Sequence, residues 1–272
     1  MTRIPERSFW KMTGSGNDFV FFDARADAPG ILETRVAIEA VCDRRKGVGA
    51  DGVVFFEADA EHAWGIRYFN RDGSLAEFCG NASLCSVRLA LELGVITPGQ
   101  RVSFQTSSGV IPGQYGPSGP EVGMPAVEGL ETAFQTRLEP GETQIGYARV
   151  GVPHLVVGCG DVGMVAVETR GRELRHLPGL RSGANVNFVS RGPDGWTYRT
   201  YERGVEEETL ACGSGSVAAA AMLVAWHGEK DPIRLWTRSG VPLTVSFRNG
   251  TPTLAGEGRL VYEGRLRDVV SG

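Results

Sequence analysis

The sequence lacks several features that would place the chain in well-defined classes of protein. No apolar run reaches 18 residues, which excludes a membrane-spanning helix. The first residues lack the apolar segment and small-residue cleavage site of a secretory signal, so a cytoplasmic protein is expected. Cysteine is scarce, and no two cysteines have the CxxC spacing of a zinc or redox site, so reduced thiols and no metal are expected. The cysteines are Cys42, Cys79, Cys85, Cys159 and Cys212.

Strong charge of either sign is also absent. The net charge is −4, from 28 basic and 32 acidic residues, which gives no basic footprint for nucleic acid or for an anionic membrane. Gly14 and Gly16 begin a possible dinucleotide fingerprint, but the third glycine is missing and a strand pattern follows instead of a helix. No lysine-containing motif suggests pyridoxal phosphate. The expected partner is therefore a small molecule, and no cofactor is expected.

What the sequence does contain is an internal repeat. Five short motifs occur twice in the same order, and Cys79-Gly80 reappears as Cys212-Gly213, 133 residues further along. Each match alone is weak, but five in constant order indicate two copies of one α/β unit. The other pairs are Gly16-Asn17-Asp18-Phe19-Val20 with Gly151-Val152-Pro153-His154-Leu155, Gly49-Ala50-Asp51-Gly52 with Gly183-Ala184-Asn185-Val186, Tyr68-Phe69-Asn70 with Thr200-Tyr201-Glu202, and Thr106-x-Ser108-Gly109-Val110 with Thr237-x-Ser239-Gly240-Val241.

The repeat predicts an α+β fold of two pseudo-symmetric halves, each a mixed curved sheet or half-barrel around a central helix. The segment 217–226 is apolar on every face, so a helix there must be surrounded by protein. Glycine and proline near residues 116–125 mark the boundary. We expect an N-terminal half at 1–120, with 262–272 as a candidate to return to it, and a C-terminal half at 121–261.

Local patterns predict the elements of the first half. The expected strands cover two parts of 9–23 around a glycine-rich loop, 53–57, 65–70, a hairpin at 102–111 and a late strand at 260–264. Helices are expected over 34–42 and from Cys79 to about Leu93, where Gly94 stops the second helix. The basic segment 44–46 is expected to be a solvated loop.

Cys79 and Cys212 each precede a predicted helix, and this position has chemical consequences. Unpaired amides and the positive end of the helix dipole favour thiolate over thiol, and such a site can bring a thiol pKa from about 8.5 into the range of roughly 3.5–7.5. The same amides can hold a carboxylate. Halves related by a pseudo-two-fold axis would bring the cysteines face to face across one α-carbon, as a thiolate base and a thiol acid.

These motifs identify a family. The chain resembles the diaminopimelate epimerases, cofactor-independent amino-acid epimerases of two pseudo-symmetric α/β halves. The resemblance covers nearly the whole chain. It rests on Lys11-Met12-x-Gly14-x-Gly16-Asn17-Asp18-Phe19, Phe69-Asn70-x-Asp72-Gly73-Ser74, Cys79-Gly80-Asn81, Pro153-His154, Asn185-Val186-Asn187-Phe188-Val189, Tyr201-Glu202-Arg203-Gly204 and Glu208-Thr209-Leu210-Ala211-Cys212-Gly213-Ser214-Gly215.

The resemblance implies both an activity and a set of site residues. The activity is epimerisation of LL-2,6-diaminopimelate to meso-diaminopimelate, in lysine and peptidoglycan precursor synthesis, with a homodimer left open. Cys79 and Cys212 would be the catalytic bases, and the amides of Gly80, Asn81, Gly213 and Ser214 would hold the reacting carboxylate. Asn17, Asn70, Asn185, Glu202 and Arg203 match substrate-binding residues, while His154 and Glu202 match residues that assist the thiols.

The chain departs from the family pattern at the far end of the substrate. Val152 stands where the family usually has asparagine, and Gly52 stands where some members have glutamine. The segment Ala82-Ser83-Leu84, before Cys85, replaces the glycine and arginine that are more familiar in the family. On strand 185–189 we expect Asn185 and Asn187 to point to opposite sides, so only Asn185 is assigned to the pocket.

Three alternatives remain open at this stage. A racemase of another amino acid, such as histidine, keeps the chemistry and changes the substrate. An isomerase of the phenazine-pathway type predicts a carboxylate in place of the cysteine pair. A redox protein would use Cys79 and Cys212 as a switchable disulfide.

Overall fold

The computed structural model describes residues 6–76, 78–248 and 250–267. The chain divides into two compact units. Unit 1 runs to Val122 and resumes at Gly256, and unit 2 comprises Gly123–Ala255. The sequence-based division placed the boundary at 120 and the returning segment at 262–272, of which 268–272 lie outside the described residues.

Unit 1 is a mixed sheet whose strands pair in a simple order. Within the described part of the unit the pairing runs β17, β1, β2, β3, β4, β5, β6, β7, and only the pairs β2–β3 and β4–β5 are parallel. The strands are β1 (Arg7–Gly14), β2 (Asn17–Asp23), β3 (Gly52–Glu57), β4 (Gly65–Asn70), β5 (Val102–Thr106), β6 (Gly109–Gly116), β7 (Gly119–Gly123) and β17 (Arg259–Leu266).

Each face of this sheet packs on a helix, because the buried strands carry apolar residues on both sides. Val20 and Phe22, with Val53 and Phe55, form one core with α1 (Arg35–Cys42), which follows the short helix η1 (Gly30–Glu33). The other face carries Phe19 and Phe21, which are fully buried. There α2 (Gly80–Glu92) packs against β1, β4, β6 and β17.

Unit 2 repeats this pairing order. Its sheet runs β8, β9, β10, β11, β12, β14, β15, β16, with β10–β11 and β12–β14 parallel and β13 paired to the end of β12. The strands are β8 (Val127–Glu131), β9 (Glu142–Val150), β10 (Val152–Cys159), β11 (Asn185–Gly192), β12 (Gly195–Glu202), β13 (Glu207–Thr209), β14 (Ile233–Trp236), β15 (Pro242–Arg248) and β16 (Thr251–Ala255). The helices are η2 (Val162–Met164), α3 (Val167–Arg175) and α4 (Gly213–His227).

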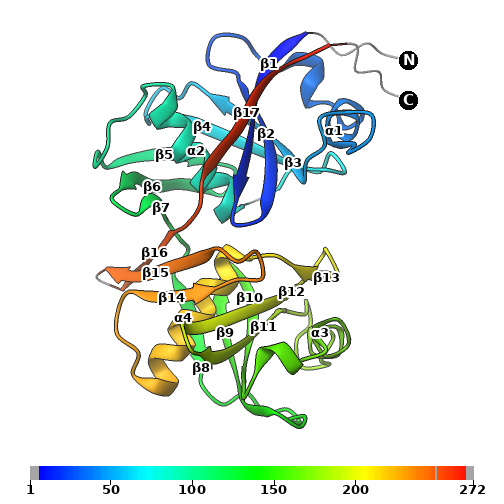
Figure 1. The fold of residues 1–272 in the computed structure, drawn as a ribbon, viewed down its shortest axis with the longest axis vertical. Coiled ribbons are helices and arrows are strands. Elements are labelled where there is room, and N and C mark those ends of the chain that lie inside the picture. The colour runs from blue at the N-terminus through cyan, green and yellow to red at the C-terminus, as the bar shows by residue number, and fades with distance from the viewer. Residues whose placement is uncertain (1–5, 77, 249, 268–272) are drawn as a thin grey trace. The chain divides into compact units, whose positions relative to one another are not determined.

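The helix α4 is the centre of unit 2. Its residues 215–223 are buried, and it packs against strands from β8 to β11 and from β14 to β16. The helix ends at Gly228, whose φ of 64° is the left-handed conformation that glycine adopts most readily. The predicted α+β fold of two similar halves, each with a sheet around a central helix, is confirmed (Figure 1).

The last strand joins the first unit. In Figure 1 β17, in red, lies beside β1, in blue, and the two pair antiparallel from Arg7 with Leu266 to Thr13 with Arg259. The strand predicted at 260–264 is therefore present and slightly longer. In the part of the chain that the structure describes, no helix is long and apolar enough to cross a membrane.

Candidate active site

Cys79 is the N-cap of α2. Its backbone is extended, with φ −141° and ψ 110°, and its sulfur accepts a hydrogen bond from the Ala82 amide at 3.5 Å. The Ser83 amide donates to the Cys79 carbonyl at 3.0 Å and so begins the helical pattern. The amides of Gly80 and Asn81 precede this bond, so they are available to an anion outside the helix.

Cys212 has the same position in unit 2. It is the N-cap of α4, with φ −126° and ψ 118°, and its buried sulfur accepts from the Gly215 amide at 3.4 Å. The hydroxyl of Ser214 lies 3.5 Å from the same sulfur. The amides of Gly213 and Ser214 occupy the first turn, equivalent to those of Gly80 and Asn81.

Cysteine is an unusual residue at this position, since Ser, Thr, Asp and Asn are the favoured N-caps. The helix α1 follows the rule, because Thr34 caps it through a bond from the Ala37 amide. An amide that donates to sulfur, at the positive end of a helix, stabilises the thiolate. Each unit therefore combines a thiol suited to proton transfer with amides suited to a carboxylate.

Asn17 is fixed in unit 1 by both ends of its amide. Its oxygen accepts from the side chain of Asn81 at 2.7 Å, and its nitrogen donates to Asp51 at 3.2 Å. The structure thus brings Asn17 next to the first turn of α2, where the sequence-based assignment needs it.

Behind Asn17 lies a charged cluster formed by Lys11, Asp18, Arg44 and Asp51. Lys11 donates to Asp18, and Arg44 bridges Asp18 and Asp51 at 2.6 and 2.9 Å. Burial opposes ionisation of Asp18, but the bonds from Arg44 and Lys11 outweigh it and hold the pKa of Asp18 below its usual range. Residues 44–46 lie exposed in a turn, as expected for a solvated loop, and Arg44 in addition pairs with Asp18 and Asp51.

Asn70 ends β4, where its side chain donates to the Ser74 hydroxyl at 3.0 Å and its backbone amide donates to the Ser74 carbonyl at 2.9 Å. On the paired strand, a Cβ added to Gly52 would lie 2.4 Å from the ring of Tyr68. Tyr68 is two residues before Asn70 on the same face of β4. The ring therefore occupies the space next to Gly52 that a side chain there would need.

In unit 2 Asn185 holds the backbone of Arg203. The Arg203 amide donates to Oδ1 of Asn185 at 2.7 Å, and the guanidinium lies 3.4 Å from the Ser182 carbonyl. His154 on β10 is the register partner of Asn185 on β11. These three predicted site residues therefore gather at the start of β11 and the end of β12.

Glu202 is paired with the second cysteine. Its carboxylate accepts from the Thr209 hydroxyl and from the Cys212 thiol. Burial raises the pKa of Glu202, and the two hydrogen bonds lower it only in part, so the pKa stays above its usual value. A carboxylate in this position can accept the proton of the Cys212 thiol.

Asn187 is absent from the site expected from the sequence, because Asn185 and Asn187 were expected to point to opposite sides of their strand. That expectation is wrong. Residues two apart on a strand share a face, so Asn185 and Asn187 point to the same side of β11, whereas Val186 and Phe188 enter the core on the α3 side. The buried side chain of Asn187 donates to Nδ1 of His154 at 3.2 Å. Counting the alternation correctly would have placed Asn187 on the same face as Asn185, but its contact with His154 follows only from the tertiary structure.

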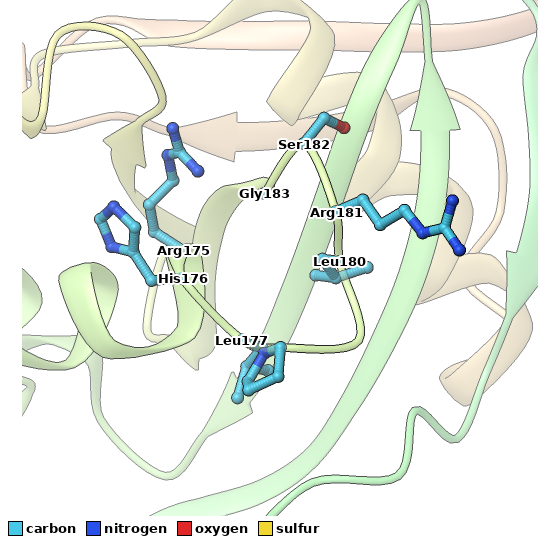
Figure 2. A pocket seen from close by; sticks show the side chains of 8 residues that line it. Arg175, His176, Leu177, Leu180, Arg181, Ser182 and Gly183 are labelled. Carbon is cyan, nitrogen blue, oxygen red and sulfur yellow. The ribbon is translucent and has the colours of Figure 1, made fainter.

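A cavity of about 330 Å³ lies beside the segment that follows α3, and residues 175–178 and 180–183 line it. Figure 2 shows the side chains of Arg175, His176 and Arg181 around it. The residues assigned to the site by resemblance are not part of this lining, so the cavity does not coincide with the candidate site.

Comparison with known proteins identifies relatives across nearly the whole chain. The family model described as diaminopimelate epimerase matches residues 9–126 and 146–261. A diaminopimelate epimerase of Gemmatimonas aurantiaca is 42% identical over 281 residues, covering 95% of this chain and 99% of the relative. That of Aquifex aeolicus is 40% identical over 276 residues, covering 96% and 98%.

Solved structures with the same fold are more distant in sequence. A phenazine biosynthesis protein of Bacillus anthracis matches with a TM-score of 0.74 at 15% identity, covering 97% of this chain and 100% of that one. A hydroxyproline epimerase of Agrobacterium vitis, with bound trans-4-hydroxy-L-proline, matches with a TM-score of 0.69 at 18% identity, covering 97% and 94%. At these identities the likeness shows the fold alone.

Proposed function

The chain belongs to the diaminopimelate epimerase family, and we propose that it interconverts LL-2,6-diaminopimelate and meso-diaminopimelate, as a step in lysine and peptidoglycan precursor synthesis. The observation that carries the proposal is the matched pair of cysteine-capped helix starts, one in each unit. Relatives named for this activity are 33–42% identical to the chain over nearly its full length, which supports the choice of substrate.

The proposed mechanism uses Cys79 and Cys212 as two bases on opposite faces of one α-carbon. One thiolate removes the α-proton and leaves a carbanion, and the other thiol delivers its own proton to the opposite face. The carbon is inverted, and the two sulfurs exchange protonation states. The amides of Gly80, Asn81, Gly213 and Ser214 hold the reacting carboxylate and stabilise the charge that develops beside it.

The remaining site residues bind the substrate or prepare a thiol. Glu202 accepts a hydrogen bond from the Cys212 thiol, which supports a role as the acceptor of its proton. Asn17, Asn70 and Asn185 offer amides to the polar groups of the substrate. Arg203 offers a guanidinium, the group best suited to grip a carboxylate with two hydrogen bonds.

A racemase acting on another amino acid is the second candidate, and one observation favours it. The Tyr68 ring fills the space beside Gly52, where some family members carry glutamine, and Val152 replaces the asparagine that the family usually has, so both positions lack a polar amide side chain. A substrate with a less polar far end would suit these residues.

Solvent deuterium distinguishes the candidates. The protein, kept reduced, is incubated in D₂O with diaminopimelate and, separately, with a panel of single amino acids that includes histidine, and label at the α-carbon is followed by mass spectrometry. We expect rapid exchange with diaminopimelate. Exchange only with another amino acid would replace the proposal by the second candidate, and no exchange, with a reversible Cys79–Cys212 disulfide, would favour a redox protein.

Alanine at either cysteine tests the two-base scheme. Because each face needs its own sulfur, Cys79→Ala and Cys212→Ala should each lower kcat at least about a thousandfold in both directions, while Cys42→Ala should stay near wild type. Near-normal turnover by either of the first two variants would refute the scheme.

A further inference from the structure

The side chain of Asn187 makes four hydrogen bonds inside unit 2, which is more than any of the assigned asparagines makes in the described residues. Its oxygen accepts from the hydroxyls of Tyr198 at 3.1 Å and Thr200 at 3.0 Å. Its nitrogen donates to the Leu155 carbonyl at 2.9 Å and to Nδ1 of His154 at 3.2 Å. All four contacts are buried.

The Leu155 contact fixes which way the amide faces. A backbone carbonyl can only accept, so the amide nitrogen must point to Leu155. The second hydrogen on the same nitrogen then points to Nδ1 of His154, and Nδ1 must present a lone pair. A neutral imidazole carries one proton, so that of His154 lies on Nε2.

The Nε2–H group of His154 is a buried donor that has no hydrogen-bond acceptor in the described part of the protein. The ring is fully buried, and among the described residues no group forms a hydrogen bond with Nε2. Burial, with a smaller contribution from the positive charge of Arg203, lowers the pKa of His154 to about 3, so the ring stays neutral. A buried donor that stays unpaired costs free energy, which suggests an acceptor that binds there.

We propose that Asn187 is a positioning residue that locks His154 as the Nε2–H tautomer, and that His154 thereby donates a hydrogen bond to a carboxylate of the bound amino acid. His154 does not exchange protons with a thiol in this scheme. The identity of the acceptor rests on the proposed function, whereas the tautomer rests only on the contacts of Asn187.

The same amide also supports the start of α4. The Tyr198 hydroxyl that donates to Asn187 lies 3.2 Å from the Cys212 carbonyl, and a Cβ at Gly215 would be 2.3 Å from Oδ1 of Asn187. Asn187 therefore links the His154 ring to the backbone that carries Cys212. One side chain would therefore hold both the His154 ring and the backbone at Cys212 in place.

Nitrogen NMR of the protein labelled with ¹⁵N-histidine tests the lock directly. The chain has four histidines, and the signal of His154 is identified by its loss in His154→Gln. We expect the Nε2–H pattern of one- and two-bond couplings, unchanged between about pH 8 and pH 5. An Nδ1–H pattern or a charged ring in the wild-type protein at pH 7 would overturn the proposal.

Two variants separate the lock from a purely structural role. Asn187→Asp keeps the shape but cannot donate, so His154 should move its proton to Nδ1 and kcat/KM should fall by about tenfold to a hundredfold. Thr200→Val removes a hydrogen bond from the same Asn187 oxygen without touching His154, so the tautomer should stay and activity should remain close to wild type. An Asn187→Asp variant with shifted tautomer and unchanged kcat/KM would overturn the donor role.

The two proposals fail in different ways. If no amino acid exchanges deuterium, the proposed function fails, but the wild-type spectrum still decides the tautomer. If exchange is rapid and the spectrum shows Nδ1–H, the function stands and the role of Asn187 falls.

Discussion

The five cysteine thiols of the chain differ in their burial and in their hydrogen bonds, and these differences change how readily each thiol ionises. Burial raises the pKa of Cys42 and of Cys159 to about 12, and it raises that of Cys85 well above its usual value. Cys79 is instead partly exposed, and its sulfur accepts an amide hydrogen. Cys212 is buried, but its sulfur accepts an amide hydrogen at a helix start as that of Cys79 does, so these two thiols are the ones suited to proton transfer.

This difference predicts the order of alkylation. With iodoacetamide at pH 8, Cys79 should react at least about tenfold faster than Cys42 or Cys159, because only the thiolate reacts and the buried thiols stay protonated. Peptide mapping by mass spectrometry at timed points measures the rates, and the unfolded protein in urea serves as the control in which all five react. Equal rates for Cys42 and Cys79 in the folded protein would contradict the assignment.

The buried carboxylate of Glu202 should lower the stability of the protein at high pH, although the proposed mechanism needs it beside Cys212. Its folded pKa lies above the unfolded value because burial disfavours the charge. Its contribution to stability is therefore present below the unfolded pKa and is lost as the pH rises through the folded pKa. Glu202→Gln removes this loss, so the free energy of unfolding of the variant should increase relative to that of wild type as the pH rises above the usual pKa of glutamate, while the variant loses turnover.

Urea unfolding at several pH values measures the difference between the two proteins. Thr209→Val is a useful companion, because it removes a hydrogen bond to the carboxylate and should increase the loss of stability at high pH. If the difference in unfolding free energy between wild type and Glu202→Gln does not change with pH, burial does not raise the pKa of Glu202.

Among the elements, α4 shows how closely the helix that begins at Cys212 fits its sheet. Its first turn lies against Asn187 and Tyr198, so the helix start has room for glycine and not for a larger residue at position 215. A surface helix would tolerate alanine there. The small residue is thus set by packing against the polar cluster and not by helix propensity.

Gly215→Ala should therefore destabilise the protein. Alanine usually stabilises a helix interior relative to glycine by about 0.5–1 kcal/mol, but the new Cβ would lie 2.3 Å from Asn187 Oδ1 and 2.4 Å from the Tyr198 hydroxyl. We expect a net loss of about 1–3 kcal/mol in the free energy of unfolding. Gly179→Ala, where nothing lies within 4 Å of the added Cβ, is the control. A Gly215→Ala variant as stable as its control would argue against the tight contact.

At the scale of the molecule, β17 completes unit 1 although it comes after the whole of unit 2. Leu266 belongs to the core with Phe9 and α1, and Gly264 lies so close to the Phe9 ring that a Cβ there would be 2.5 Å away. The first unit therefore depends on residues that follow unit 2 in the sequence, whereas unit 2 is continuous in sequence.

Removing β17 should affect the units unequally. A chain that ends at Ala255 leaves β1 with an unpaired edge, so amides of β1 should exchange with D₂O at least about tenfold faster, while those of β10 and β11 keep their protection. A chain that ends at Arg267 keeps β17 and is the control. Hydrogen exchange with mass spectrometry reads both units in one experiment, and equal loss in the two would mean that they fold only together.

Much of this organisation could be predicted from the sequence, because it depends on local patterns. The segment 217–226 is apolar on every face, which predicted a surrounded helix, and this holds for residues 217–223 of α4, whereas Val224 and Ala225 are exposed. The Cys-Gly pairs before helical patterns placed Cys79 and Cys212 at helix starts, and both are N-caps. The motif repeat predicted two similar halves, and the two sheets have the same order of parallel and antiparallel pairs.

What the sequence by itself determined is thus the repeat, the buried helices and the thiols at their starts, since each follows from the periodicity or position of neighbouring residues. Only the tertiary structure decided the environments of Arg44, Asn187 and His154. Arg44 neutralises Asp18 across 26 positions of sequence, and Asn187 reaches His154 across 33. Such contacts depend on the register of paired strands and on which atom of a side chain faces which partner, and short sequence patterns carry no information about either.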